Sequence, residues 1–138
     1  MFMGWLFRKK HERGLKEEAK IIEAEISRSK RFGFQFGVLT VEISHRVPRG
    51  LSKVLPGRTM SFYVLQKSVR LYDQVIESEL RRKYYIILPQ TNRDGVEVVK
   101  TRIYRIAQEQ HWGSVSMKSA VYPEDGENFM ALLDKCSR

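Results

Sequence analysis

The sequence predicts an α+β domain of the ferredoxin-like type, in which helices pack on an antiparallel sheet and an N-terminal amphipathic helix precedes that sheet. Its 138 residues suit one domain. Hydrophobic residues make up 42% of the chain, enough to form a core. The predicted elements run helix, strand, helix, strand, strand, helix, strand, helix, and the central βαββαβ unit is the ferredoxin-like one. We expect all the helices of this unit to lie on one face of the sheet.

A helix is predicted for residues 12–31. Leu15, Ala19, Ile22 and Ile26 recur at helical spacing and form a narrow apolar stripe. A stripe of this width fits either a second helix or the edge of a domain, so the helix is a candidate element for a homodimer. The remaining faces are expected to be a solvated surface of mixed charge, formed by Lys16, Glu17, Glu18, Lys20, Glu23 and Glu25.

Residues 1–11 are predicted to be a flexible tail with an apolar tip, 1–7, followed by the basic group 8–10. A secretory signal has its charges before a longer apolar stretch, so no signal peptide is expected. The tip with its basic collar is suited to weak contact with an anionic membrane. A frayed terminus, or packing on a second subunit, is the alternative. A cytoplasmic location, with peripheral membrane contact as an option, agrees with the single cysteine of the chain.

Residues 32–138 are predicted to form the domain itself. Its first strand, 34–44, is rich in β-branched and aromatic residues. Proline and glycine then interrupt the chain, which leaves room for a short helix at 51–55 before a longer one at 59–69. Two further strands, 73–79 and 83–88, are separated by three residues and are expected to form a hairpin.

The last third of the chain adds a helix, a strand and a helix. Thr91 and Asp94 resemble a capping box at the start of a helix over 93–110. Ser114 to Tyr122 alternates as a strand does, and a turn at 123–126 separates it from a final helix that ends near Cys136. The buried face of the 93–110 helix is predicted from its spacing to comprise Val96, Val99, Ile103 and Ile106.

The charge balance points to anionic partners. Lys and Arg number 25 against 16 Asp and Glu, a net charge of +9, which favours nucleic acid, nucleotides or an acidic membrane surface. The basic and aromatic run 81–85 could serve an RNA-recognition fold, in which aromatic rings on strands stack bases. Tyr84 and Tyr85 alternate along a strand, so at most one ring faces such a ligand. RNA binding is therefore kept only as a less favoured alternative.

The stretch from about Arg28 to Lys135 resembles the GGDEF domains of diguanylate cyclases, which make cyclic di-GMP from two GTP. Tyr85 to Pro89 stands where the family has an apolar strand that ends in Leu-Pro. The segment 91–95 is similar to the family's turn into the next helix, and 121–126 is similar to its YPEDG-type turn. Leu132 to Lys135 occupies the place of a segment that usually carries an Ala-Asp pair. The resemblance implies the nucleotide-cyclase-like version of the predicted fold and a bacterial signalling role.

The catalytic parts of the family pattern are altered. The signature falls on Leu80, Arg81, Arg82, Lys83 and Tyr84, where only the aromatic residue agrees. Its glycines allow close backbone approach to the substrate, and its acids support the metal. In the first-strand motif, Glu42 is a vestigial metal position and lacks its acidic partner because Ser44 replaces it. The guanine-contacting Asn falls near Gly50, and the family's entry motif is absent.

These changes predict no diguanylate cyclase activity, no catalytic residues, no bound metal and no cofactor. The three histidines of the chain are scattered, so a zinc site is not expected either. Cys136 is interpreted as a passive surface or packing residue.

One binding motif of the family persists in part. Arg70 and Asp73 match the Arg-x-x-Asp of the family's inhibitory site, which captures cyclic di-GMP away from the active site. The guanidinium suits a phosphate or a guanine edge, and the carboxylate suits guanine N–H groups. The motif is shifted by one residue relative to the signature, and an ordinary surface ion pair is the alternative.

Two functional hypotheses follow. The chain is a signalling adaptor that acts as a cyclic di-GMP receptor through Arg70 and Asp73. Alternatively, it is a ligand-free protein–protein interaction module that docks an acidic partner through the basic tip 80–84.

Overall fold

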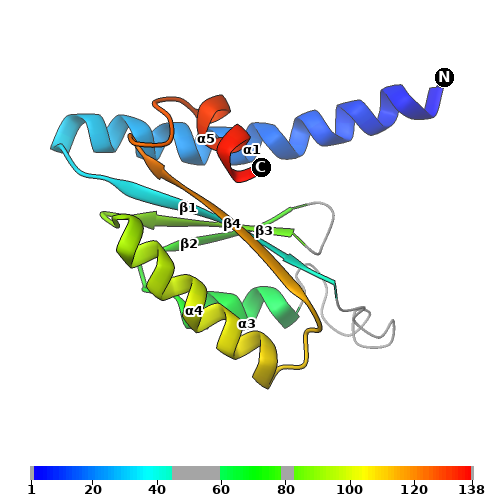
Figure 1. Cartoon of the computed structure of the whole chain (residues 1–138). Coiled ribbons are helices and arrows are strands. Elements are labelled where there is room, and N and C mark those ends of the chain that lie inside the picture. The colour runs from blue at the N-terminus through cyan, green and yellow to red at the C-terminus, as the bar shows by residue number, and fades with distance from the viewer. Residues whose placement is uncertain (1, 45–59, 79–82, 138) are drawn as a thin grey trace.

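The computed structural model describes residues 2–44, 60–78 and 83–137 of the chain, with side chains for residues 17–44, 61–78 and 83–136 (Figure 1). The order of helices and strands is the predicted one. The predicted short helix at 51–55 and the hairpin turn at 80–82 lie outside the described residues. The elements are α1 (Phe2–Phe32), β1 (Phe36–Ile43), α3 (Met60–Ser68), β2 (Gln74–Glu77), β3 (Lys83–Pro89), α4 (Arg93–Glu109), β4 (Val115–Tyr122) and α5 (Phe129–Ser137).

The four strands form one antiparallel sheet in the order β2-β3-β1-β4. The two strands that are farthest apart in the order, β2 and β4, are the edges. On the two central strands, Glu42 near the end of β1 is directly opposite Lys83 at the start of β3. At the other end of β1, Phe36 is opposite Tyr122 on β4 and Pro89 on β3. The predicted α+β fold with a ferredoxin-like sheet is confirmed.

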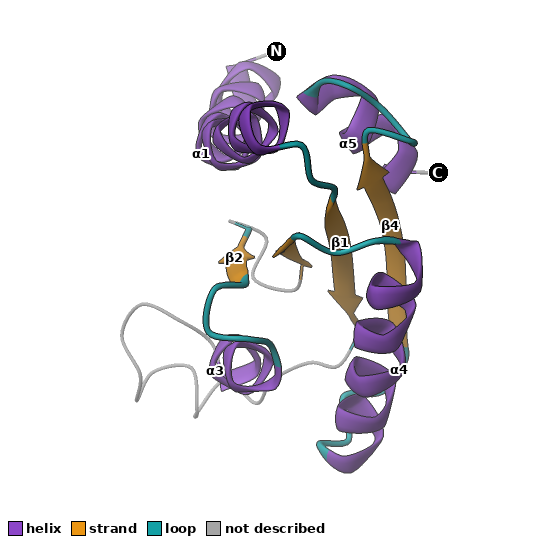
Figure 2. Cartoon of the chain, turned by 90° about the vertical axis from the view of Figure 1, so that its left-hand side faces the viewer, coloured by secondary structure: helices purple, strands orange, loops and turns teal. Residues whose placement is uncertain are grey.

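Helices cover both faces of the sheet: the two helices of the predicted βαββαβ unit share one face, as expected, and the flanking helices cover the other face, which was not expected. In Figure 2, α3 and α4 lie on one side of the strands, and α1 and α5 lie on the other. The strand residues divide accordingly, because successive side chains of a strand point to opposite faces. Leu39 and Val41 pack in the core under α3 and α4, and Phe36 and Val38 pack under α1 and α5. This explains why β1 is apolar at both alternating sets of positions.

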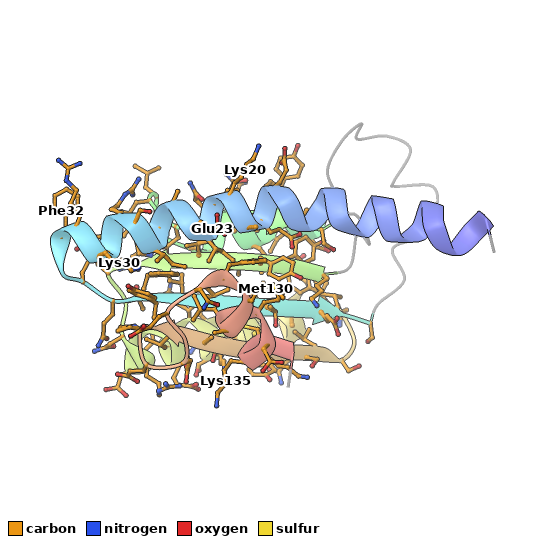
Figure 3. The ribbon with its side chains drawn as sticks, turned by 90° about the horizontal axis from the view of Figure 1, so that it is seen from above. Lys20, Glu23, Lys30, Phe32, Met130 and Lys135 are labelled. Carbon is orange, nitrogen blue, oxygen red and sulfur yellow. The ribbon has the colours of Figure 1, made fainter. Side chains whose placement is uncertain are left out.

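The first helix is longer than predicted. It begins at Phe2 and not at Glu12, and its 31 residues extend about 46 Å. Its N-terminal part reaches past the end of the sheet (Figures 1 and 3). No helix among the described residues is long and apolar enough to span a membrane.

The apolar stripe of α1 packs on the chain's own sheet. Ile22 and Ile26 are buried in the core with Phe36 and Val38. The part of the stripe that was a candidate for dimer formation is therefore used within the domain from Ala19 onward. Glu18 and Glu25, expected on the solvated surface, are buried as well, because both lie one helical turn from the stripe residue Ile22.

The start of α4 differs from the predicted capping box. The N-cap is Asn92, whose Oδ1 accepts from the backbone N–H of Gly95 at 2.9 Å. Thr91 lies one residue earlier, and its hydroxyl donates to the Pro89 carbonyl at 2.9 Å. The predicted buried face of α4 is confirmed at Val96, Val99 and Ile103.

Candidate functional site

The predicted pair Arg70 and Asp73 lies at the junction between α3 and β2. The Arg70 Nε donates to Asp73 Oδ2 at 3.1 Å, and Nη2 donates to Oδ1 at 3.2 Å. The Arg70 backbone N–H also donates to Oδ2, at 2.8 Å. The Asp73 side chain is only 1% exposed. Both carboxylate oxygens are thus occupied in a charge-assisted, two-point contact, and this pair is more buried than an ordinary surface ion pair.

The Arg70 guanidinium also joins this junction to the end of β3. Its Nη2 donates to Thr91 Oγ1 at 2.6 Å and to the Pro89 carbonyl at 3.2 Å. The hydrogen bond with Asp73 is the main cause that raises the pKa of Arg70. The side chain is still 40% exposed. Arg70 therefore links the α3–β2 junction to the end of β3, and its outer side faces solvent. We call this arrangement the clamp of Arg70.

Two hollows lie on either side of this clamp, separated by a stacked pair. The Arg70 guanidinium lies 4.6 Å from the centre of the Tyr72 ring, and Tyr72 is 59% exposed. The first hollow, of about 330 Å³, is here called the Arg70 hollow and is lined by Phe34, Gln35, Arg70, Gln90, Thr91, Asn92 and Gly95. The second, of about 220 Å³, is called the α1 groove and is lined by Lys20, Ile21, Ala24, Glu25, Arg28, Tyr72, Gln74, Ile87 and Pro89.

A second guanidinium lies close to the same junction. Arg102 on α4 donates from Nη1 to the carbonyl of Ser68, the last residue of α3, at 3.1 Å. Arg70 is two residues further along the chain from this carbonyl. The junction between α3 and β2 therefore carries two arginines, an arrangement that favours an anionic ligand.

Glu42, which was predicted to be a vestigial metal position, lies at the opposite end of β1. Lys83 Nζ is 3.8 Å from Glu42 Oε1, and the Glu42 side chain is 59% exposed. The two residues line a hollow of about 400 Å³ together with Ile43, Ser44 and the start of β4. Glu42 is the one carboxylate in the described lining, and the described residues contain no group of three His, Cys, Asp or Glu suited to a metal. In this hollow, the Lys83 ammonium thus lies beside the Glu42 carboxylate, the one described group that could bind a metal.

No protein-family model matches the chain, and no curated protein sequence matches it. Solved structures do. A DGC protein from Thermotoga maritima superposes with a TM-score of 0.66 and 15% identity over 88% of this chain and 90% of that one. The GGDEF domain of YfiN (TpbB) from Pseudomonas aeruginosa superposes with a TM-score of 0.68 and 16% identity, over 83% of this chain and 78% of that one. The chain folds as a GGDEF-like domain. PelD 158-CT from Pseudomonas aeruginosa is also similar, with a TM-score of 0.52 and 15% identity over 86% of this chain and 41% of that one.

In this GGDEF-like domain, the predicted signature is only partly within the described residues. Leu80, Arg81 and Arg82 lie outside them, as does Gly50. Lys83 is the partner of Glu42 and lies 5.5 Å from the Tyr85 ring. Tyr84 is 1% exposed and belongs to the core under α3 and α4, so its ring is a structural element of the sheet.

The sequence analysis missed the acceptors on the buried face of α1. Glu25 lines the α1 groove and is buried, and Ser29, one turn further along the helix, is 2% exposed. Within the part of the chain that the structure describes, neither Glu25 Oε1 nor Ser29 Oγ has a hydrogen-bond partner. Their spacing from Ile22 could have indicated this, because residues 18, 22, 25, 26 and 29 fall on one side of a helix.

Cys136 lies in the core between α5 and the sheet. Its Sγ is 3.8 Å from the Val38 carbonyl, to which it donates. Burial raises the pKa of this thiol to about 12, so it stays protonated at neutral pH and is not a nucleophile. A packing role, one of those predicted for it, is consistent with this environment.

Proposed function

We propose that this GGDEF-like domain is a catalytically inactive signalling module that acts by binding. The observation that carries the proposal is the Lys83 ammonium beside Glu42 in the hollow at the end of β1. Mg²⁺ needs hard anionic oxygen ligands, and a cation at this position opposes it. Arg82, the neighbouring residue in the sequence, adds a second positive charge to the predicted signature.

The proposal of inactivity is tested by incubating the protein with GTP and Mg²⁺ and separating the nucleotides by chromatography. We expect no cyclic di-GMP, whereas an active GGDEF domain assayed in parallel provides the positive control. Any product that requires this protein would refute the proposal.

The ligand that best fits the binding role is cyclic di-GMP, held at the clamp of Arg70. A guanidinium recognises phosphate through its N–H donors, and Nε and Nη2 of Arg70 already donate to Asp73 and Thr91, which fixes the group and leaves Nη1 for the phosphate. Stacking on Tyr72 and the nearby Arg102 add an aromatic surface and a second cation. Asp73 acts in this arrangement as a positioning residue, because both of its oxygens already accept from Arg70.

Isothermal titration with cyclic di-GMP tests this binding role. The native chain should release or take up heat at micromolar ligand, and Arg70→Ala should lose most of the affinity. Lys135→Ala, which removes an exposed cation from α5, serves as the control and should bind normally. A denaturation curve for each variant separates lost binding from lost folding. Equal binding by Arg70→Ala and the native chain would contradict the role of the clamp.

A ligand-free interaction module is the second candidate, and one observation favours it. Leu71 is fully exposed beside the exposed ring of Tyr72, so an apolar pair lies on the surface at the α3–β2 junction. The predicted docking tip, 80–84, lies mostly outside the described residues. RNA recognition through Tyr84 and Tyr85 has less support, because both rings are buried. An absence of heat with cyclic di-GMP would favour the interaction module.

A further inference from the structure

The α1 groove contains a buried carboxylate that the clamp of Arg70 does not use. Glu25 is 7% exposed, and no group among the described residues donates to its Oε1. Its Oε2 lies 3.6 Å from Nη1 of Arg28, whose side chain is 60% exposed. An acceptor without a donor in such a place costs about 1–3 kcal/mol, more when it is charged. A ligand that donates hydrogen bonds would remove this cost.

The surroundings of Glu25 limit what such a ligand can be. The groove also presents the cations of Lys20 and Arg28 and the exposed ring of Tyr72. Figure 3 shows Lys20 projecting from α1 on the side away from α5. With two cations around one carboxylate, a simple amine is disfavoured, and an anionic molecule that carries N–H donors is favoured. The volume of about 220 Å³ is smaller than the roughly 300–1,000 Å³ of a pocket for a drug-sized ligand, and suits a single base.

We propose that the α1 groove binds the base of a phosphate-bearing guanine nucleotide, with Glu25 as the acceptor that recognises guanine. Guanine presents two adjacent donors, N1–H and N2–H, which match the two oxygens of a carboxylate, whereas adenine presents an acceptor at N1. The Tyr72 ring supplies a surface on which the base stacks. Lys20, Arg28 and the neighbouring Arg70 supply the positive charge for phosphate.

This inference rests on the proposed binding of cyclic di-GMP and names the guanine-reading residue for it. Asp73 cannot fill this role without breaking its contacts with Arg70, since both of its carboxylate oxygens already accept from that guanidinium. Tyr72 connects the two parts, because it lines the α1 groove and carries Arg70 on its ring. A phosphate at Arg70 and a base beside Tyr72 are thus compatible with one ligand.

The test compares Glu25→Gln with Glu23→Gln in titrations with cyclic di-GMP, GMP and cyclic di-AMP. Glu23 lies on the exposed face of the same helix, so its variant removes an equal charge without reaching the groove (Figure 3). Glu25→Gln should weaken binding of both guanine ligands about tenfold, because an amide cannot accept both donors. It should leave any weak binding of cyclic di-AMP unchanged. Glu23→Gln should bind all three ligands as the native chain does.

A second variant keeps the test informative if the first one misfolds. Tyr72→Ala removes an exposed ring and should also weaken the guanine ligands. If Arg70→Ala abolishes cyclic di-GMP binding while Glu25→Gln and Tyr72→Ala leave it intact, the guanine site is wrong and the binding role of Arg70 stands. If GMP binds in a Glu25-dependent way and cyclic di-GMP does not bind, the guanine site stands and the dinucleotide role fails. If no guanine nucleotide binds, both are overturned.

Discussion

Two buried carboxylates on the same side of the molecule differ in their partners. Asp73 accepts from the guanidinium and the backbone of Arg70, which satisfies both of its oxygens. Glu25 has only the exposed Arg28 at 3.6 Å, and its Oε1 has no donor among the described residues. A buried carboxylate with all its partners, such as Asp73, holds two segments together. A buried carboxylate without a full set of donors, such as Glu25, lowers the stability of the fold.

The ionisation of Glu25 should therefore oppose folding. Burial raises its pKa, and the charge of Arg28 only partly offsets this effect. A carboxyl whose pKa is raised in the folded state contributes its full stability below the unfolded pKa and loses it as the pH rises through the folded pKa. Glu25→Gln has no such ionisation. The variant should gain stability relative to the native chain as the pH rises from about 4.3, the usual pKa of Glu, to 7.

Urea denaturation at several pH values between 4 and 7.5 measures this difference. Glu23→Gln is the control and should show little change in relative stability over the same range. A Glu25→Gln variant that loses stability relative to the native chain as the pH rises from 4 to 7.5 would contradict the prediction. It would indicate that the charged carboxylate makes a net favourable pair with Arg28, or with Lys20 across the groove.

The sequence indicated some residues of the site near Arg70, but not the contacts or the burial of these residues. Arg70 and Asp73 were found as a short motif, because their spacing is visible in the chain. That Thr91 completes the clamp could not be read from it, because the partner is 21 residues away and comes close only through the pairing of β2 with β3. Glu25 was assigned to the solvated surface because it is charged, although its helical position places it beside Ile22 and Ile26.

At the level of elements, the contact between β1 and α4 depends on one glycine. Gly37 lies on the face of β1 that α4 covers, and the side chain of Val96 occupies the space where a Cβ would be. The Val96 side chain is completely buried, so it cannot move aside freely. Gly37→Ala should therefore destabilise the domain by about 1–3 kcal/mol, the usual cost of overpacking a core.

Thermal or urea unfolding of Gly37→Ala gives this cost, and a double variant shows its origin. Adding Val96→Ala should make the Gly37→Ala change much less costly than it is in the native background, because the clashing methyl group is gone. Additive losses in the double variant would mean that the strain arises elsewhere in β1.

Element types and order were predictable because the periodicity of each segment is strong. The start of α4 at Arg93 was predicted correctly, but its cap was placed one residue early, since Thr91 and Asn92 are both good caps and only the structure shows that the Thr91 hydroxyl bonds to Pro89. The covering of the sheet by helices on both faces was missed. The apolar residues at both alternating sets of positions in β1 and β3 indicate two buried faces, which a sheet with one solvated face would not need.

At the scale of the whole molecule, described cations line two different hollows. At the end of β1, Lys83 neutralises the one carboxylate of the described lining. At the α3–β2 junction lie Arg70 and Arg102, and Arg70 lies over the ring of Tyr72, which lines the α1 groove with Lys20 and Arg28. A cation thus lies beside the one described carboxylate of the first hollow, and cations line the candidate nucleotide site at the second. The contact between α1 and the second site was not predicted, because it arises only when the helix packs across the sheet.

The long first helix combines two roles that a truncation can separate. From Ala19 onward it closes the core over Phe36 and Val38, whereas its N-terminal part extends past the sheet (Figure 1). Removing residues 1–16 should leave the melting temperature within a few degrees of the native value, because the buried stripe remains. Removing residues 1–31 should give an unfolded or aggregated protein, since the apolar face under α1 is then exposed.

Light scattering on the native chain and on the chain lacking residues 1–16 tests the predicted homodimer. If the extending part of α1 mediates a dimer, the native chain should be dimeric and the chain lacking 1–16 monomeric, with unchanged circular dichroism. A dimer that survives this truncation would place the contact elsewhere, since Ile22 and Ile26 are already buried within one copy. A native chain that is monomeric at every concentration would contradict the predicted homodimer. The helix α1 would then serve only to cover the sheet and to line the α1 groove.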